Sequence, residues 1–214
     1  MKIAILISGH GSNMQALVEA AQPAGVQIVL VAANRQAAGI DWAKQKEIPT
    51  VIHPVSAFNN RSEQEQALAA SIEAAGADLV FLAGYMAILS AEFVARFAGK
   101  IINIHPSLLP DYKGLDTHQR ALDDGRTQHG ASVHLVTAAL DDGPVLLQAV
   151  VDVLEGDNAE TLAARTLSAE HILYPAVLNA LAAGDIQLHD TDFTWDQAAL
   201  KALKETYPQL RLSN

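Results

Sequence analysis

The chain has 214 residues, half of them hydrophobic, and a formal net charge of −10 at pH 7. This length fits one α/β domain with a buried core. The 14 Lys and Arg residues are scattered, which argues against binding to nucleic acid, because a phosphate backbone attracts clustered basic side chains. A small anionic ligand is not excluded, since backbone N–H groups can bind phosphate without a basic residue.

The sequence carries no signal for a membrane or for secretion. No run of about 20 apolar residues occurs, and the apolar run at residues 3–7 is too short for the core of a secretory signal. The chain has no cysteine, so a thiol nucleophile and a thiolate metal site are excluded. We expect a cytoplasmic protein.

Apolar runs and amphipathic segments alternate through the first half of the chain. The expected strands are residues 2–7, 27–32, 50–52, 79–83 and 100–104. The expected helices are residues 13–21, 37–46, 61–74 and 91–97. This alternation predicts a mostly parallel sheet with helices on both faces.

The pattern changes after residue 105. Residues 106–118 read as a loop, residues 117–124 as a short helix, and residues 131–137 and 145–151 as two strands. The connection between these strands is too short for a helical crossover, so they should form an antiparallel pair on the edge of the sheet.

A long helix is expected over residues 158–181, capped by Asp157 or Asn158 and kinked or interrupted at Pro175. A strand-like piece and a polar helix should follow. No linker or repeat is visible, so one domain over residues 1–214 is the simplest interpretation.

A glycine-rich loop, Ser8–Asn13, joins the first strand to the first helix. Glycine allows a ligand to approach the backbone closely, and the first N–H groups of a helix have no internal partners, which together make an anion site. The spacing matches neither a P-loop nor a dinucleotide fingerprint. The alternative is a simple turn capped by Ser12 or Asn13.

A second candidate site lies at the end of the fifth strand. Asn103 and His105 are two residues apart, so their side chains project from the same face of the strand. An amide and an imidazole can stabilise an oxyanion, and a carboxylate can orient the imidazole. Asp141, in the turn between the edge strands, is the candidate carboxylate. Alternatively, His105 only binds backbone carbonyls in the loop.

Six motifs together resemble the glycinamide ribonucleotide transformylase family of folate-dependent formyltransferases. They lie at residues 7–13, 82–89, 103–110, 130–134, 141–144 and 170–175, and the third reads Asn-Ile-His-Pro-Ser-Leu-Leu-Pro. The resemblance implies a Rossmann-like formyltransferase fold with a phosphate-binding half (1–100) and a folate-binding and catalytic half (101–214). It implies transfer of a formyl group from 10-formyltetrahydrofolate to the amine of glycinamide ribonucleotide in purine synthesis.

The resemblance also implies roles for matching residues. The catalytic residues would be Asn103, His105 and Asp141. The substrate would be bound by Gly11, Ser12, Asn13, Pro106, Ser107 and Glu170. The folate would be bound by Arg61, Met86, Ala87, Ile88, Leu89, Asn103, Thr137, Ala138, Ala139, Leu140 and Asp141. His10, Ala87, Asp116 and Asp142 depart from the residues usual in the family. A homodimer is left open, and neither nucleic acid nor a membrane is expected as a partner.

The histidines do not indicate a metal site. The spacings of His118, His129, His134 and His171 match no zinc pattern, and no metal is expected. His134, in the middle of a strand, is interpreted as a packed or surface residue.

Related enzyme classes remain as alternatives. A formyltetrahydrofolate deformylase uses similar Asn, His and Asp residues with water as the acceptor, but usually has an extra N-terminal domain. A methionyl-tRNA formyltransferase usually has a C-terminal nucleic-acid-binding domain. A catalytically silent binder would not need Asn103, His105 and Asp141.

Overall fold

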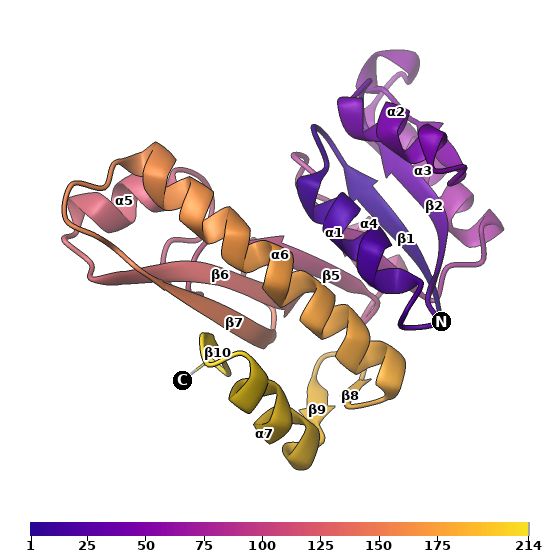
Figure 1. The fold of residues 1–214 in the computed structure, drawn as a ribbon. Coiled ribbons are helices and arrows are strands. Elements are labelled where there is room, and N and C mark those ends of the chain that lie inside the picture. The colour runs from indigo at the N-terminus through magenta and orange to yellow at the C-terminus, as the bar shows by residue number, and fades with distance from the viewer. Residues whose placement is uncertain (214) are drawn as a thin grey trace.

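The structure is a computed structural model that describes residues 1–213, and an eight-stranded sheet forms its centre (Figure 1). The strand order is β10-β7-β6-β5-β4-β1-β2-β3. The strands are β1 (Lys2–Ile7), β2 (Gln27–Ala33), β3 (Thr50–Ile52), β4 (Leu79–Leu82), β5 (Ile101–His105), β6 (Gln128–Leu135), β7 (Val145–Asp152) and β10 (Leu210–Arg211). Strands β1 to β5 are parallel, and β6, β7 and β10 extend the sheet in antiparallel pairs.

Helices cover both faces of this sheet. They are α1 (Ser12–Ala21), α2 (Ala38–Gln45), α3 (Arg61–Ala74), α4 (Ala91–Arg96), α5 (Thr117–Asp123), α6 (Ala159–Ala183) and α7 (Gln197–Thr206), with a 3-10 turn at Val55–Ala57. Successive residues of a strand point to opposite faces. Thus Ile3 and Ile5 of β1 belong to a core with α1, α2 and α6, whereas Ala4 and Leu6 belong to a second core with α3 and α4. The predicted fold class is confirmed.

The long helix α6 differs from the expectation. It runs without a break from Ala159 to Ala183, so the interruption expected at Pro175 is wrong. Proline removes one backbone hydrogen bond, but the neighbouring Tyr174 is fully buried and its hydroxyl donates to the carbonyls of Leu82 and Ile102, each at 3.0 Å. This packing holds the helix against the sheet on both sides of the proline. The cap is Asn158, whose side chain accepts from the N–H groups of Glu160 and Thr161.

The chain after α6 contains more structure than the sequence predicts. The polar helix is present as α7, and the strand-like piece is a hairpin of β8 (Ile186–Leu188) and β9 (Phe193–Trp195). The two-residue strand β10 then pairs with β7 and takes the edge of the sheet. The expected edge pair β6–β7 therefore lies one strand inside the edge.

Within residues 1–213, the helices are all too short or too polar to cross a membrane. The loops that matter for the site leave the carboxyl ends of β1, β4 and β5. These strands are neighbours in the sheet. The chain leaves β1 and β4 in opposite directions along the sheet, and such a point is where open α/β sheets bind ligands.

Candidate active site

The glycine-rich loop after β1 forms an open helix start. Gly11 is the N-cap of α1 with a φ of 79°, a conformation that favours glycine. A Cβ on Gly11 would also lie 3.0 Å from the terminal methyl group of Met14. No side chain of the described residues caps this helix, so the alternative of a turn capped by Ser12 or Asn13 is not observed. The first N–H groups of α1 therefore remain available to an anion.

Hydrogen bonds fix this loop against the loop that follows β4. The N–H of Ser8 donates to the carbonyl of Gly84 at 3.1 Å, and the N–H of Met86 donates to the Ser8 hydroxyl at 2.8 Å. That hydroxyl in turn donates to Asn34 at 2.8 Å, and Arg35 donates to the Ser8 carbonyl at 2.6 Å. The loop after β1 and the loop after β4, which are far apart in the sequence, are thus held together by hydrogen bonds.

The side chain of Glu170, on α6, lies beside the start of α1. The side-chain amide of Asn13 donates to the Glu170 carboxylate at 2.6 Å, and both side chains are buried. Burial raises the pKa of Glu170, and the bond from Asn13 offsets part of that rise. Two of the residues expected to bind substrate therefore contact each other beside the glycine-rich loop.

This buried carboxylate predicts a pH-dependent stability. A raised folded-state pKa means that Glu170 contributes stability below its ordinary pKa, and that this contribution is lost as the pH rises through the folded value. We expect Glu170→Gln to be more stable than the parent at pH 7, with the difference vanishing toward pH 4. Gln also supplies an N–H to the buried Asn13 carbonyl, which has no partner among the described residues.

Urea unfolding at the two pH values measures this difference. Glu155→Gln, at an exposed position, is the control and should show no such dependence. A Glu170→Gln variant that is no more stable than the parent at pH 7 would contradict the prediction.

The second predicted site comes together at the end of β5. The Nδ1 atom of His105 lies 3.4 Å from the carboxylate of Asp141, and both side chains are buried. The Nε2 atom of His105 lies 3.0 Å from the carbonyl of Tyr112. The same Asp141 oxygen accepts the N–H of Gly114 at 2.9 Å. Both ring nitrogens of His105 thus face oxygen acceptors, and the protonated ring is the form that donates to both.

The backbone of the turn between β6 and β7 fixes the position of Asp141. Asp141 has a φ of 48°, which is uncommon for a residue with a side chain and marks local strain. Gly143 lies so close to β6 that a Cβ would be 1.8 Å from the carbonyl of Leu135. Neighbouring Asp142, by contrast, is exposed and pairs with Lys113. The departure at Asp142 therefore leaves the placement of Asp141 intact.

His134 is a site residue that sequence reasoning missed. It pairs with Asn103 across β5 and β6, and its Nε2 lies 3.1 Å from the Asn103 amide nitrogen and 3.7 Å from Asp141. Burial lowers the pKa of His134, which favours the neutral ring. Its Nδ1 faces the carbonyl of Leu135 at 2.8 Å and must be the donor, so Nε2 accepts from Asn103. His134 thus orients the Asn103 amide. The register that pairs the two residues was the signal that could have identified it.

Pro106 and Ser107 belong to the internal structure of the loop after β5. The Ser107 hydroxyl donates to the carbonyl of Asp111 at 2.6 Å, and the Pro106 carbonyl accepts from Thr117 at 2.7 Å. Ser107 is fully buried. The structure therefore shows both residues shaping the loop.

The residues expected around the folate include exposed apolar side chains on two loops. Met86, Ile88 and Leu140 are large apolar side chains that are more than half exposed. They come from the loop after β4 and from the turn that carries Asp141. Thr137, Ala138 and Ala139 complete that turn, and the Thr137 hydroxyl donates to the Ala139 carbonyl at 3.2 Å. Leu89 is buried, and Ala87 is exposed. Exposed apolar side chains of this kind can contact the flat face of a ring.

Arg61 lies at the start of α3, where its guanidinium donates to Glu65 at 2.8 Å. Glu65 is buried and accepts both the N–H of Ser90, at 3.1 Å, and its hydroxyl. Burial, helped by the Glu65 charge, raises the pKa of neighbouring Tyr85 to about 12. Glu65 therefore joins Arg61 to the end of the loop that carries Met86–Leu89, a link the sequence did not reveal.

The group formed by Asn103, His105 and Asp141 and the uncapped start of α1 lie at the carboxyl ends of strands of one parallel sheet, as expected for an α/β enzyme. Comparison with known proteins identifies the class more closely. Residues 1–178 match the formyl transferase family, and the chain belongs to this family.

The similar proteins include enzymes of two kinds. The chain is 44% identical to phosphoribosylglycinamide formyltransferase of Escherichia coli over 89% of this chain and 91% of that protein. It is 44% identical to the phosphoribosylglycinamide formyltransferase structure from Coxiella burnetii, with a TM-score of 0.87 over 92% of this chain and 93% of that chain. Formyltetrahydrofolate deformylase from Burkholderia mallei is 30% identical, with a TM-score of 0.82 over 92% of this chain and 70% of that chain.

Proposed function

We propose that this chain transfers the formyl group of 10-formyltetrahydrofolate to the amine of glycinamide ribonucleotide, a step of purine synthesis. The observation that carries the proposal is the presence of two sites at the same edge of the sheet, at the carboxyl ends of β1 and β5, with only β4 between these strands. The open start of α1, with Asn13 and Glu170, could bind a phosphorylated ribose. Asn103, His105 and Asp141 could stabilise the charge that develops on a reacting carbonyl. The likeness to the E. coli enzyme over nearly the whole length of both chains supports the same substrates.

In this proposal, the backbone N–H groups at Gly11, Ser12 and Asn13 bind the substrate phosphate. Glu170, held by Asn13, faces the ribose hydroxyls. Binding the phosphate far from the reacting amine fixes the position of the amine, which converts binding energy into rate. One domain over residues 1–214 carries both halves of the site, and Glu170 reaches from the second half into the phosphate-binding half.

At the reacting centre, the substrate amine attacks the formyl carbon and the formyl oxygen gains negative charge. The bond between the formyl carbon and N10 of the folate then breaks, and the proton lost by the amine passes to N10, so that tetrahydrofolate leaves. The Asn103 amide has a second N–H free of His134, and this group stabilises the developing oxyanion. His105 adds the positive charge of its ring, which Asp141 supports. The Tyr112 carbonyl occupies the Nε2 side of His105, so direct donation from Nε2 to the oxyanion requires this loop to shift.

The folate is proposed to lie along the rim formed by residues 86–89 and 137–141, with Arg61 beside it. The exposed apolar side chains of Met86, Ile88 and Leu140 fit a pterin ring. Arg61 offers a cation for the carboxylates at the other end of the molecule. Burial of the reacting groups under this rim strengthens their electrostatic interactions.

Glu65 gives a test of the folate site. We expect Glu65→Gln to raise the KM for 10-formyltetrahydrofolate about 10-fold, because hydrogen bonds to charged groups are worth about 1.5–3 kcal/mol. The KM for glycinamide ribonucleotide and kcat should stay near the parent values, since Glu65 contacts neither the glycine-rich loop nor the trio Asn103, His105 and Asp141. Initial-rate kinetics with each substrate varied in turn measure these effects.

Glu73→Gln, on the same helix α3 as Glu65, is the matched control, because it breaks an exposed ion pair with Arg96 of α4. Exposed pairs contribute little, so its kinetics should resemble those of the parent. Equal KM values in the Glu65 and Glu73 variants would remove Glu65 from the folate site.

One assay separates the proposed function from the deformylase alternative. Purified protein is incubated with 10-formyltetrahydrofolate, with and without glycinamide ribonucleotide, and tetrahydrofolate and formate are measured. We expect tetrahydrofolate to appear only with the amine substrate and without formate. Formate release that does not depend on the amine substrate would identify a deformylase, and no turnover in either mixture would indicate a silent binder.

A further inference from the structure

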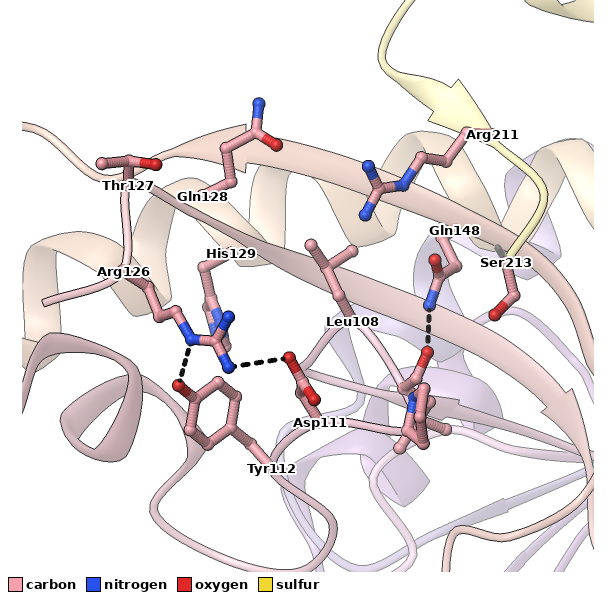
Figure 2. Close-up of a pocket in the computed structure, with 12 residues that line it drawn as sticks. Leu108, Asp111, Tyr112, Arg126, Thr127, Gln128, His129, Gln148, Arg211 and Ser213 are labelled. Carbon is pink, nitrogen blue, oxygen red and sulfur yellow. Dashed lines mark hydrogen bonds and ion pairs between the residues drawn. The ribbon is translucent and has the colours of Figure 1, made fainter. Parts of the chain in front are cut away.

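A cavity of about 320 Å³ lies between the loop that follows β5 and the C-terminal strand β10 (Figure 2). It is enclosed by the loop Leu108–Tyr112, the start of β6, Gln148 of β7 and the C-terminal residues Arg211 and Ser213. None of the catalytic trio, the glycine-rich loop or the folate rim lines it. The cavity is therefore separate from the site of the proposed reaction.

Two arginines from different elements line this cavity. Arg126 pairs with Asp111 at 3.1 Å and donates to the Tyr112 hydroxyl at 2.8 Å. Arg211 makes no ion pair within residues 1–213, and its Nε is buried there without an acceptor, which typically costs about 1–3 kcal/mol. Among the described residues that line the cavity, the two guanidinium groups of Arg126 and Arg211 outnumber the single carboxylate of Asp111, which pairs with Arg126.

A buried histidine supplies a second unpartnered group. His129 is 1% exposed, and its Nε2 has no hydrogen-bond partner in the described part of the chain. Burial, followed by the neighbouring His118, lowers the pKa of His129 to about 4, so the ring is neutral at pH 7. The Gln148 amide nitrogen is already used by the Leu109 carbonyl, at 2.9 Å, and by Ser132. The neutral His129 ring bonds to the Pro106 backbone, which leaves its Nε2 as an acceptor, so the unmet hydrogen-bond donor lies at Arg211.

We propose that this cavity binds an oxyanion, the phosphate or carboxylate group of a small molecule, between the guanidinium groups of Arg211 and Arg126. The planar fork of arginine matches both kinds of oxyanion. An anion here satisfies the Arg211 Nε–H. The loop whose Tyr112 carbonyl accepts from His105 lines the same cavity, so a bound anion would lie against it. The proposal rests on the cavity alone and does not depend on the proposed reaction.

The test is a titration of the ¹⁵N-labelled full chain with inorganic phosphate and, separately, with malonate, followed by NMR. With at least one of them, the Arg211 Nε–H signal and the amide signals of Thr127 and Gln128 should shift and saturate with a dissociation constant of about 1 mM or tighter, roughly 4 kcal/mol of binding. Phosphate alone, malonate alone or both would identify which oxyanion the cavity prefers. A lack of saturable shifts with both would overturn the proposal.

Variants separate this cavity from the substrate site. Arg211→Gln keeps the backbone pairing of β10 but should abolish the shifts at Thr127 and Gln128. Arg96→Gln, at an exposed arginine elsewhere, should preserve them. Shifts that survive in Arg211→Gln would also overturn the proposal. Phosphate-induced shifts at Gly11, Ser12 and Asn13 report separately on the proposed function, so the two can fail independently.

Discussion

His105→Ala is expected to lower turnover by about 10²-fold or more, the loss typical of removing one group that stabilises an oxyanion. The side chain is buried at the end of β5 and faces Asp141 and the Tyr112 carbonyl. Its removal takes away the imidazole that is proposed to stabilise the formyl oxygen and leaves the Asp141 carboxylate without its partner. Steady-state kinetics at saturating concentrations of both substrates measure the effect.

A histidine outside the site provides the control for this substitution. His189→Ala changes an exposed residue in the turn between β8 and β9, and its turnover should stay near that of the parent. Circular dichroism should show that both variants fold. If His105→Ala keeps turnover within a few-fold of His189→Ala, His105 has no role in the chemistry.

The local pattern of the sequence was enough to predict most of the sheet. Strands such as β1 and β4 are short, continuous apolar runs, which is typical of strands buried on both faces. Their periodicity and the helices between them predict a parallel sheet without any knowledge of long-range contacts. The same reasoning could not predict β10, because two residues carry no periodicity and the strand forms only by pairing with β7.

In the candidate site, too, local relations could be predicted from the sequence and long-range contacts could not. Asn103 and His105 share a face because they are two residues apart, and that relation is local. The partner of Asn103 depends on the antiparallel register of β5 and β6, which places His134 opposite it. Glu65 lies four residues after Arg61 on one helix, yet its bond to Ser90 spans 25 residues and requires α3 and the loop after β4 to pack together. Pairings of this kind depend on tertiary structure.

The continuity of α6 also depends on tertiary contacts. Proline in the interior of a helix is unfavourable by about 3 kcal/mol in isolation, and this local rule predicts an interruption at Pro175. The buried ring of Tyr174 and the apolar face of the helix against β6 and β7 outweigh that cost. The result keeps Glu170 and Tyr174 on one helix, which connects the Glu170 carboxylate to the core of the sheet.

Asp141→Asn is expected to slow turnover by about 10–100-fold, because a hydrogen bond to a charged group is worth about 1.5–3 kcal/mol and each 1.4 kcal/mol is a factor of ten. Asn has nearly the same shape and can still accept the N–H of Gly114, so the turn should keep its structure. What is lost is the negative charge 3.4 Å from His105 Nδ1, which supports the protonated ring.

The neighbouring residue, Asp142, provides a matched control for this prediction. Asp142→Asn is the same chemical change in the same turn, but Asp142 is 57% exposed and pairs with Lys113 at the surface. Exposed ion pairs are worth about 0–1 kcal/mol, so this variant should turn over almost as fast as the parent. Thermal unfolding should show that both variants fold. Equal turnover in the two variants would mean that the charge of Asp141 does not act on His105, and the trio would reduce to Asn103 and His105. A loss confined to Asp141→Asn would assign the effect to the buried carboxylate and not to the negative charge of the turn as a whole.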